Sequence, residues 1–168
     1  MATTSGSTTL SVQMKEDLAA STSRLTGYSI SIQPAMAAAS PGWTNGSAAH
    51  QVSKAYQLSG TATAVATDID LATVICADGT TGFTRVRIFA IYNDATLDTA
   101  ILTTGGGTNP FKPYLTGTTP TISIEPGGVL FLIKPLGTLG WLVDETNKVL
   151  RLDPGAATVP FRVVIFGN

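Results

Sequence analysis

The chain has 168 residues and a formal net charge of −1, and only 12% of its residues are charged, about half of the roughly 25% that is usual in soluble domains. This length suits one domain, and a net charge near zero supplies no basic field, so we expect neither nucleic acid nor an anionic membrane as a partner. No apolar run approaches the roughly 20 residues that span a bilayer, and the Ser/Thr-rich start lacks the pattern of a secretory signal, which favours synthesis in a cytoplasm.

The first 55 residues are predicted to be an arm followed by an attachment or packing segment. Residues 1–9 form a Ser/Thr/Gly tract with too little apolar surface to fold alone, so we expect a flexible arm. Within residues 10–55, alternating apolar positions at 10–14 and 28–32 predict two strands. Residues 34–49 contain Pro-Gly and Asn-Gly turns and are interpreted as a long loop, of a length that is usually functional or packed on a neighbour.

Two residues of this loop are candidates for contact with another molecule. Trp43 lies near its centre, and a Trp side chain is costly to leave in water, so it either folds back over its own sheet or packs on a partner. Asn45 belongs to the neighbouring Asn-Gly turn. Both alternatives for Trp43 stay open on the sequence alone.

Residues 56–168 are predicted to form an all-β domain. Short β-type runs follow one another there at about the 8 to 12 residue spacing that is typical of a sandwich or barrel. The predicted strands are residues 56–58, 64–66, 71–76, 84–93, 99–102, 121–125, 129–134, 141–143, 148–152 and 160–166. Because these strands do not alternate with helices, we predict an antiparallel β-sandwich core, with a jelly roll as the favoured form and an immunoglobulin-like sandwich as the open alternative.

One strand and one turn carry the strongest local patterns. Residues 84–93 are apolar on both faces, except for Arg85 and Arg87 at one end. This pattern predicts a central strand whose charged end reaches solvent or a partner. The sequence Pro-Gly-Gly at 126–128 predicts a sharp corner between two strands, because Pro presets φ and Gly supplies a positive φ.

The residues that usually carry chemistry are scarce. His50 is the only histidine, and the only cysteine, Cys76, lies in an apolar run where we expect it to be buried. Asp68 and Asp70 share one face of an extended segment, but no ligand-rich loop accompanies them. The triple glycine at 105–107 lacks the Lys-Ser/Thr of a phosphate-binding loop. We therefore expect no enzyme activity, no cofactor and no catalytic, cofactor-binding or metal-binding residues.

Several turn and strand motifs point to a family resemblance. They are Ile91-Tyr-Asn93, a Gly-rich turn before Asn109-Pro-Phe111, Ile122-x-Ile124-x-Pro-Gly-Gly128, Leu132 to Pro135, Gly140-Trp141-x-Val143, Leu150-Arg-Leu152 and a terminal Val-Val-Ile-Phe-Gly167. Over residues 56–168 this set resembles small virion structural proteins of tailed bacteriophages. The resemblance implies a β-sandwich that decorates a capsid or forms part of a tail or fibre, is made in the host cytoplasm and resides in the virion. It transfers no site residues.

Two functions follow as hypotheses. The first is a capsid decoration or cement protein that binds the head surface as a homo-oligomer, with a trimer favoured by the resemblance; a surface of Thr, Ser, Gly and Ala suits permanent contacts with itself and with capsid or tail proteins. The alternative is a tail or fibre module that binds a host glycan or receptor, although Trp141 is favoured as a core residue. The aromatic residues considered for stacking on sugar rings are Trp43, Tyr92, Tyr114 and Trp141. The candidate interaction surface for both comprises Trp43, Asn45, Asn109, Phe111 and Tyr114.

Overall fold

The computed structural model describes residues 44–45, 51–112, 115, 120–134 and 139–168. These residues form strands, turns and loops without a helix, so the all-β prediction is confirmed. None of the described residues belongs to a helix with the length and apolar character needed to cross a membrane. The predicted arm at residues 1–9 and most of the segment 10–55 lie outside the described residues.

Eleven strands make up the described part of the chain. In chain order they are β1 (Thr44–Asn45), β2 (Gln51–Val52), β3 (Lys54–Thr63), β4 (Thr67–Asp70), β5 (Arg85–Asn93), β6 (Leu102–Gly105), β7 (Thr121–Ile124), β8 (Val129–Ile133), β9 (Trp141–Leu142), β10 (Val149–Asp153) and β11 (Thr158–Gly167).

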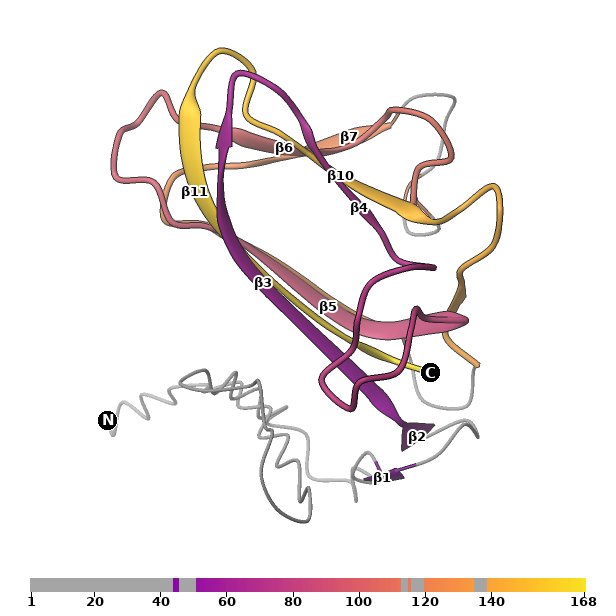
Figure 1. The fold of residues 1–168 in the computed structure, drawn as a ribbon. Helices are drawn as coiled ribbons and strands as arrows, with labels where there is room; N and C mark the ends of the chain where they lie inside the picture. Colours follow the sequence, from indigo (N-terminus) through magenta and orange to yellow (C-terminus); the bar gives the residue numbers. More distant parts are fainter. Residues whose placement is uncertain (1–43, 46–50, 113–114, 116–119, 135–138) are drawn as a thin grey trace, which may run out of the picture. The chain divides into compact units, whose positions relative to one another are not determined.

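The strands are arranged in two antiparallel sheets and one small pair. The first sheet has the order β3-β11-β5-β8, with β9 also paired to β5, and the second has the order β4-β10-β6-β7. Figure 1 shows β4, β10, β6 and β7 in one layer and β3, β11 and β5 in the other. Strands β1 and β2 form a separate two-stranded parallel pair.

The strand order is that of a jelly roll. Strand β3 pairs with β11, β4 with β10, β5 with β8 and β6 with β7. These four pairs are nested in the sequence, and successive pairs alternate between the two sheets, so a single long hairpin is rolled into a sandwich. The predicted sandwich is confirmed, and the topology that the sequence left open between a jelly roll and an immunoglobulin-like fold is now decided.

The core lies between the two sheets and is formed mainly by apolar side chains. Strand β5 is central in the first sheet, as predicted, and its Phe89 is buried at the middle of the core. The Phe89 ring makes edge-to-face contacts with Phe111, at a centroid distance of 6.1 Å, and with Trp141, at 5.6 Å. Burying each such side chain contributes on the order of 1.5–3 kcal/mol. These rings therefore tie the loop before β7 and strand β9 to the centre of the first sheet.

Three of the predicted strands are wrong or displaced, and one of them, 99–102, lies mostly in a turn before β6, which begins at Leu102. Residues 64–66 form a turn in which Ala64 has a φ of +52°, and residues 71–76 form turns with a single bridge at Ile75. The strand in this region is β4 instead, where Ile69 is buried and the flanking acids are not. Asp70 ends it, because its side chain accepts a hydrogen bond from the Ala72 N–H at 2.9 Å and so closes a turn.

The charged end of β5 also differs from the prediction. Arg85 is partly exposed, but the Arg87 side chain is only 1% exposed, so it does not reach solvent as expected. The pairing of β5 with β11 shifts register between Val86 and Ile88, so Arg87 lies at an irregularity that interrupts the simple alternation of the strand. A position that looked like a charged surface is therefore part of the interior.

The predicted corner at 126–128 is confirmed. It carries the chain from β7 in the second sheet to β8 in the first. Gly127 has a φ of +71° and donates its N–H to the C=O of Asn93 at 2.9 Å, which anchors the corner to the end of β5. A left-handed φ is costly for residues with a Cβ, so glycine suits this position.

Candidate interaction surface

Asn109 lies at the start of a segment that runs beside β10. It is exposed, has a φ of +50°, and its C=O accepts hydrogen bonds from the N–H groups of Lys148 (3.1 Å) and Val149 (2.9 Å). Asn tolerates the left-handed region better than most residues. The structure therefore places Asn109 at the surface, as its predicted role in contacts requires, and fixes its backbone to the beginning of β10.

Phe111 does not lie at the surface, and its predicted role there is corrected. Its side chain is 1% exposed and packs against Phe89, and its N–H donates to the C=O of Val149 at 2.7 Å. An aromatic ring in this position is held by the free energy of its burial, so it is a core residue that anchors the 109–111 segment. The sequence did not distinguish these neighbours because both follow the same Gly-rich turn.

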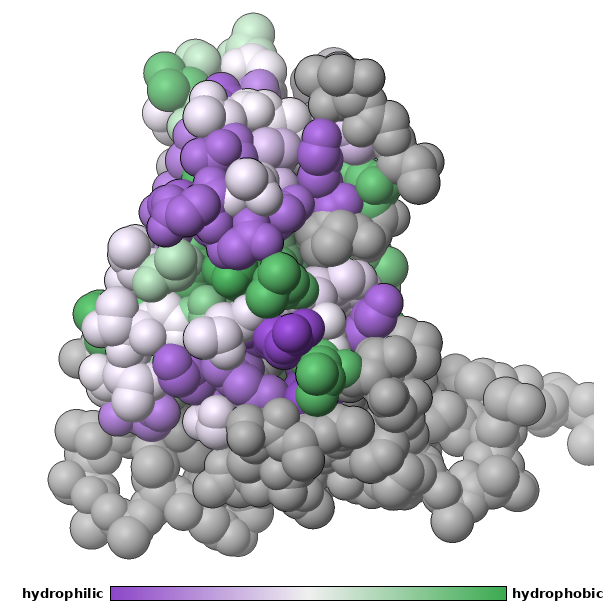
Figure 2. All heavy atoms as spheres, turned by 90° about the vertical axis from the view of Figure 1, so that its right-hand side faces the viewer, coloured by the Kyte–Doolittle hydropathy of each residue, from purple (hydrophilic) through white to green (hydrophobic). Residues whose placement is uncertain are grey.

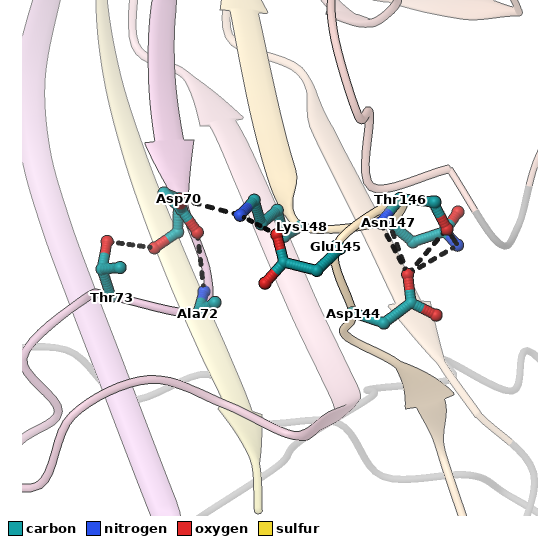
Figure 3. Close-up of polar contacts among 8 residues, drawn as sticks. All are labelled: Asp70, Ala72, Thr73, Asp144, Glu145, Thr146, Asn147 and Lys148. Atoms are coloured by element: carbon teal, nitrogen blue, oxygen red, sulfur yellow. Dashed lines mark hydrogen bonds and ion pairs between the residues drawn. The ribbon is translucent and has the colours of Figure 1, made fainter.

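A small charged group surrounds the start of β10 next to Asn109. The Lys148 ammonium lies 2.8 Å from a carboxylate oxygen of Glu145 and 4.0 Å from one of Asp70 (Figure 3). The hydrogen bond to Glu145 is the main cause that raises the pKa of Lys148 above its ordinary value. Exposed pairs of this kind contribute little to stability, so their main effect is to make this rim polar.

The turn before β10 is organised by Asp144. One of its carboxylate oxygens accepts hydrogen bonds from the N–H and hydroxyl of Thr146, at 2.8 and 2.7 Å, and from the N–H of Asn147, at 3.0 Å (Figure 3). The hydrogen bonds from Thr146 are the largest cause that lowers the pKa of Asp144. The turn is thus a self-contained Asx-type structure rather than a site with unused ligands.

Two other side chains that can carry chemistry are buried or lie in an ion pair. Cys76 is fully buried, as predicted, and burial raises the pKa of its thiol, which favours the neutral form. Among the described residues, no group of three or more His, Cys, Asp or Glu side chains is arranged to hold a metal ion. Asp68, one of the two acids that share a face of β4, lies 3.4 Å from the guanidinium of Arg151.

The structure places only one of the three remaining predicted interaction residues. Trp43 and Tyr114 lie outside the described residues, and Asn45 ends the short strand β1. Trp141, which the glycan hypothesis considered, is 8% exposed and packs on Phe89, so its assignment to the core is confirmed. Of the five predicted contact residues, the structure therefore shows Asn109 alone with an exposed side chain.

The outer edge of the first sheet was not among the predicted contact surfaces. Strand β8 ends that sheet, and its Val129 and Ile133 side chains are 52% and 43% exposed. The side of the molecule shown in Figure 2 has hydrophobic residues in small groups among hydrophilic ones. The available signal was the uninterrupted apolar run at 129–133, but an apolar run identifies a strand and not its position in a sheet.

A scan against protein-family models, a search of curated proteins and a search of solved structures each found no match to this chain.

Proposed function

We propose that this chain is a non-enzymatic structural protein of a tailed-bacteriophage virion, and that it decorates the capsid surface as an oligomer. The observation that supports the proposal most directly is the jelly-roll order of its strands, an architecture that viral capsid domains use. The same architecture occurs in lectins, so it supports an assembly or binding role without selecting between them.

The family motifs occupy structural positions, which agrees with a structural role. Ile91-Tyr-Asn93 ends β5, Pro-Gly-Gly at 126–128 makes the corner between the sheets, and the terminal apolar run at 163–167 lies in β11. These residues shape the sandwich and present its loops. The polar rim around Asn109 and Lys148 is the surface that we assign to contacts with the capsid.

The alternative is a tail or fibre module that binds a host glycan or receptor. The structure leaves fewer aromatic rings available for stacking on a sugar. Trp141 is in the core, and the Arg162 guanidinium lies over the Tyr92 ring, 4.7 Å from its centroid. No described residue adds a specific observation in favour of glycan binding. We therefore treat it as an outcome of the test.

The test is co-sedimentation of the purified chain with heads and, separately, with tails of the virus that encodes it. We expect saturable binding to heads, and weaker binding after removal of residues 1–9 without a change in the thermal unfolding of the domain. Binding to tails alone, accompanied by a glycan-array signal that Trp43→Ala abolishes, supports the alternative. Binding to neither particle contradicts the proposal.

A further inference from the structure

Strand β8 forms an apolar edge of the first sheet. It pairs with β5 on one side and ends the strand order on the other. Its sequence is Val-Leu-Phe-Leu-Ile, and residues 126–133 contain no ionisable side chain. Native proteins usually protect such edges with charges, prolines or bulges, and none of these devices occurs within β8.

The hydrogen bonds of the sheet show which backbone groups of β8 point outward. Lys134, just after the strand, donates its N–H to the C=O of Arg87 at 2.7 Å. Because bonded and outward positions alternate in an antiparallel pair, the even-numbered residues of β8 bond to β5. The N–H and C=O groups of Val129, Phe131 and Ile133 therefore point away from β5, and the described part of the chain places no backbone partner there.

The side chains of β8 separate into two faces. Leu130 and Leu132 pack against the core, whereas Val129, Phe131 and Ile133 lie on the outer face of the sheet. The edge therefore combines unused backbone groups with exposed apolar side chains, which is the combination that favours addition of another strand.

The β8 sequence is complementary to itself. It reads almost the same in both directions around Phe131, so in an antiparallel pair of two copies Val129 lies opposite Ile133, and Leu130 lies opposite Leu132. In this register all the outward N–H and C=O groups of the two copies face each other as hydrogen-bonded pairs. A β-branched residue meets a β-branched residue and Phe131 meets Phe131, which are favourable cross-strand pairs.

We propose that β8 pairs antiparallel with β8 of a second copy, about a two-fold axis beside Phe131, and joins the first sheets of two copies into one. The proposal deepens the self-association assumed in the proposed function and rests on that function for its biological role. A net charge of −1 offers little repulsion between copies. The contact is isologous, as a two-fold interface requires, and it differs from the trimer that the family resemblance favours.

The contact extends slightly beyond β8. Strand β9 pairs with the next stretch of the same side of β5, and its Leu142 is 46% exposed. A single pair of short strands is nevertheless a small interface, below the roughly 1,200 Å² of a stable complex. We therefore expect the dimer to dissociate on dilution.

The test is the mass of the full-length chain by light scattering over a range of concentrations. The wild type is expected to move from monomer to dimer as concentration rises. The double variant Val129→Lys/Ile133→Lys places two lysines opposite each other at both ends of the pair, so we expect its dimer Kd to rise at least about tenfold. The variant Val129→Lys/Ile133→Glu places opposite charges together only in the antiparallel register, so we expect it to dimerise again.

Matched controls separate this contact from general stickiness. Val65 and Leu97 are 74% and 70% exposed and lie in bends outside the strands, so Val65→Lys/Leu97→Lys is expected to leave the dimer unchanged. Thermal unfolding of each variant checks that the monomer still folds. A monomeric or trimeric wild type at every concentration, or a double-lysine variant that dimerises like the wild type, overturns the proposal.

Amide hydrogen exchange gives a second, residue-level test. The N–H groups of Val129, Phe131 and Ile133 are expected to exchange fast in dilute solution and slowly at high concentration, whereas those of Leu130 and Leu132 stay protected. Protection of the outward amides in the monomer would place another segment on this edge and overturn the proposal.

Head binding is measured with the same variants, so that the two proposals can fail separately. A monomeric double-lysine variant that still binds heads keeps the proposed function. A wild-type dimer that binds neither heads nor tails keeps the two-fold contact and removes the function.

Discussion

Strands β4 and β8 each lie at one end of a sheet, but the outer face of β4 carries acidic side chains and that of β8 carries apolar ones. In β4 the inner residue Ile69 is buried, and the outward acids Asp68 and Asp70 lie 3.4 Å from Arg151 and 4.0 Å from Lys148. In β8 every residue is apolar. The two strands serve the core in the same way and differ in what they offer to a second chain.

This difference shows that inner and outer faces of a strand can be specified independently. Alternation sends one set of side chains to the core, and the other set is left to decide the surface. Outward carboxylates oppose pairing with another strand, because a second copy would bring like charges together and desolvate them. The apolar β8 has no such penalty. We therefore expect two copies to associate through the first sheet and not through β4.

The largest expected effect concerns the inner faces. Ile69→Ala removes a side chain that is 4% exposed, so we expect a loss of about 2–5 kcal/mol in the free energy of unfolding. Leu130→Ala removes a partly buried side chain at the open edge, and we expect a loss of about 1–2 kcal/mol in dilute solution. Urea unfolding of both variants measures the difference, and equal losses would show that the β8 edge is as closed as that of β4.

The second prediction concerns a substitution that makes the outer face of β4 apolar, like that of β8. Asp68→Val removes an exposed ion pair, so we expect the unfolding free energy to change by no more than about 0.5 kcal/mol. We expect concentration-dependent association to increase, measured by light scattering. Asp98→Val is the matched control, since Asp98 is exposed in a loop and carries the same charge. Equal association of both variants would mean that net charge, and not the edge, controls self-association.

The smallest expected effect is a pH dependence of the turn that leads into β10, the strand that pairs with β4. Hydrogen bonds from Thr146 and Asn147 lower the pKa of Asp144 in the folded state. Its contribution to stability is therefore present above the ordinary pKa of aspartate and is lost as the pH falls through the lower, folded value. The gap in Tm between wild type and Asp144→Ala is expected to close in acid.

Dimerisation through β8 provides the contrast, because residues 126–133 contain no titratable side chain. We expect its Kd to change little over the range in which the Asp144 turn loosens. A Tm gap that persists below the aspartate range would contradict the assignment of this turn to the Asp144 carboxylate.

Local pattern was sufficient for part of this fold and insufficient for the rest. The apolar alternation of residues 84–93 predicted β5, and Pro-Gly-Gly predicted the corner that leads into β8. The run 71–76 was predicted as a strand but forms turns, because the Asp70 side chain closes a turn and the true strand is the acidic β4. Asn109 and Phe111 were predicted to share a surface, but only the first is exposed.

By itself the sequence determined that this chain is an all-β domain of low charge, because alternation and turn residues act over a few neighbouring positions. Only the tertiary structure decided the nested pairing of β3 with β11 and β4 with β10, the burial of Arg87 and Phe111, and the open edge at β8. These properties depend on which distant strands become neighbours. That choice follows from packing two sheets around one core, which no local pattern records.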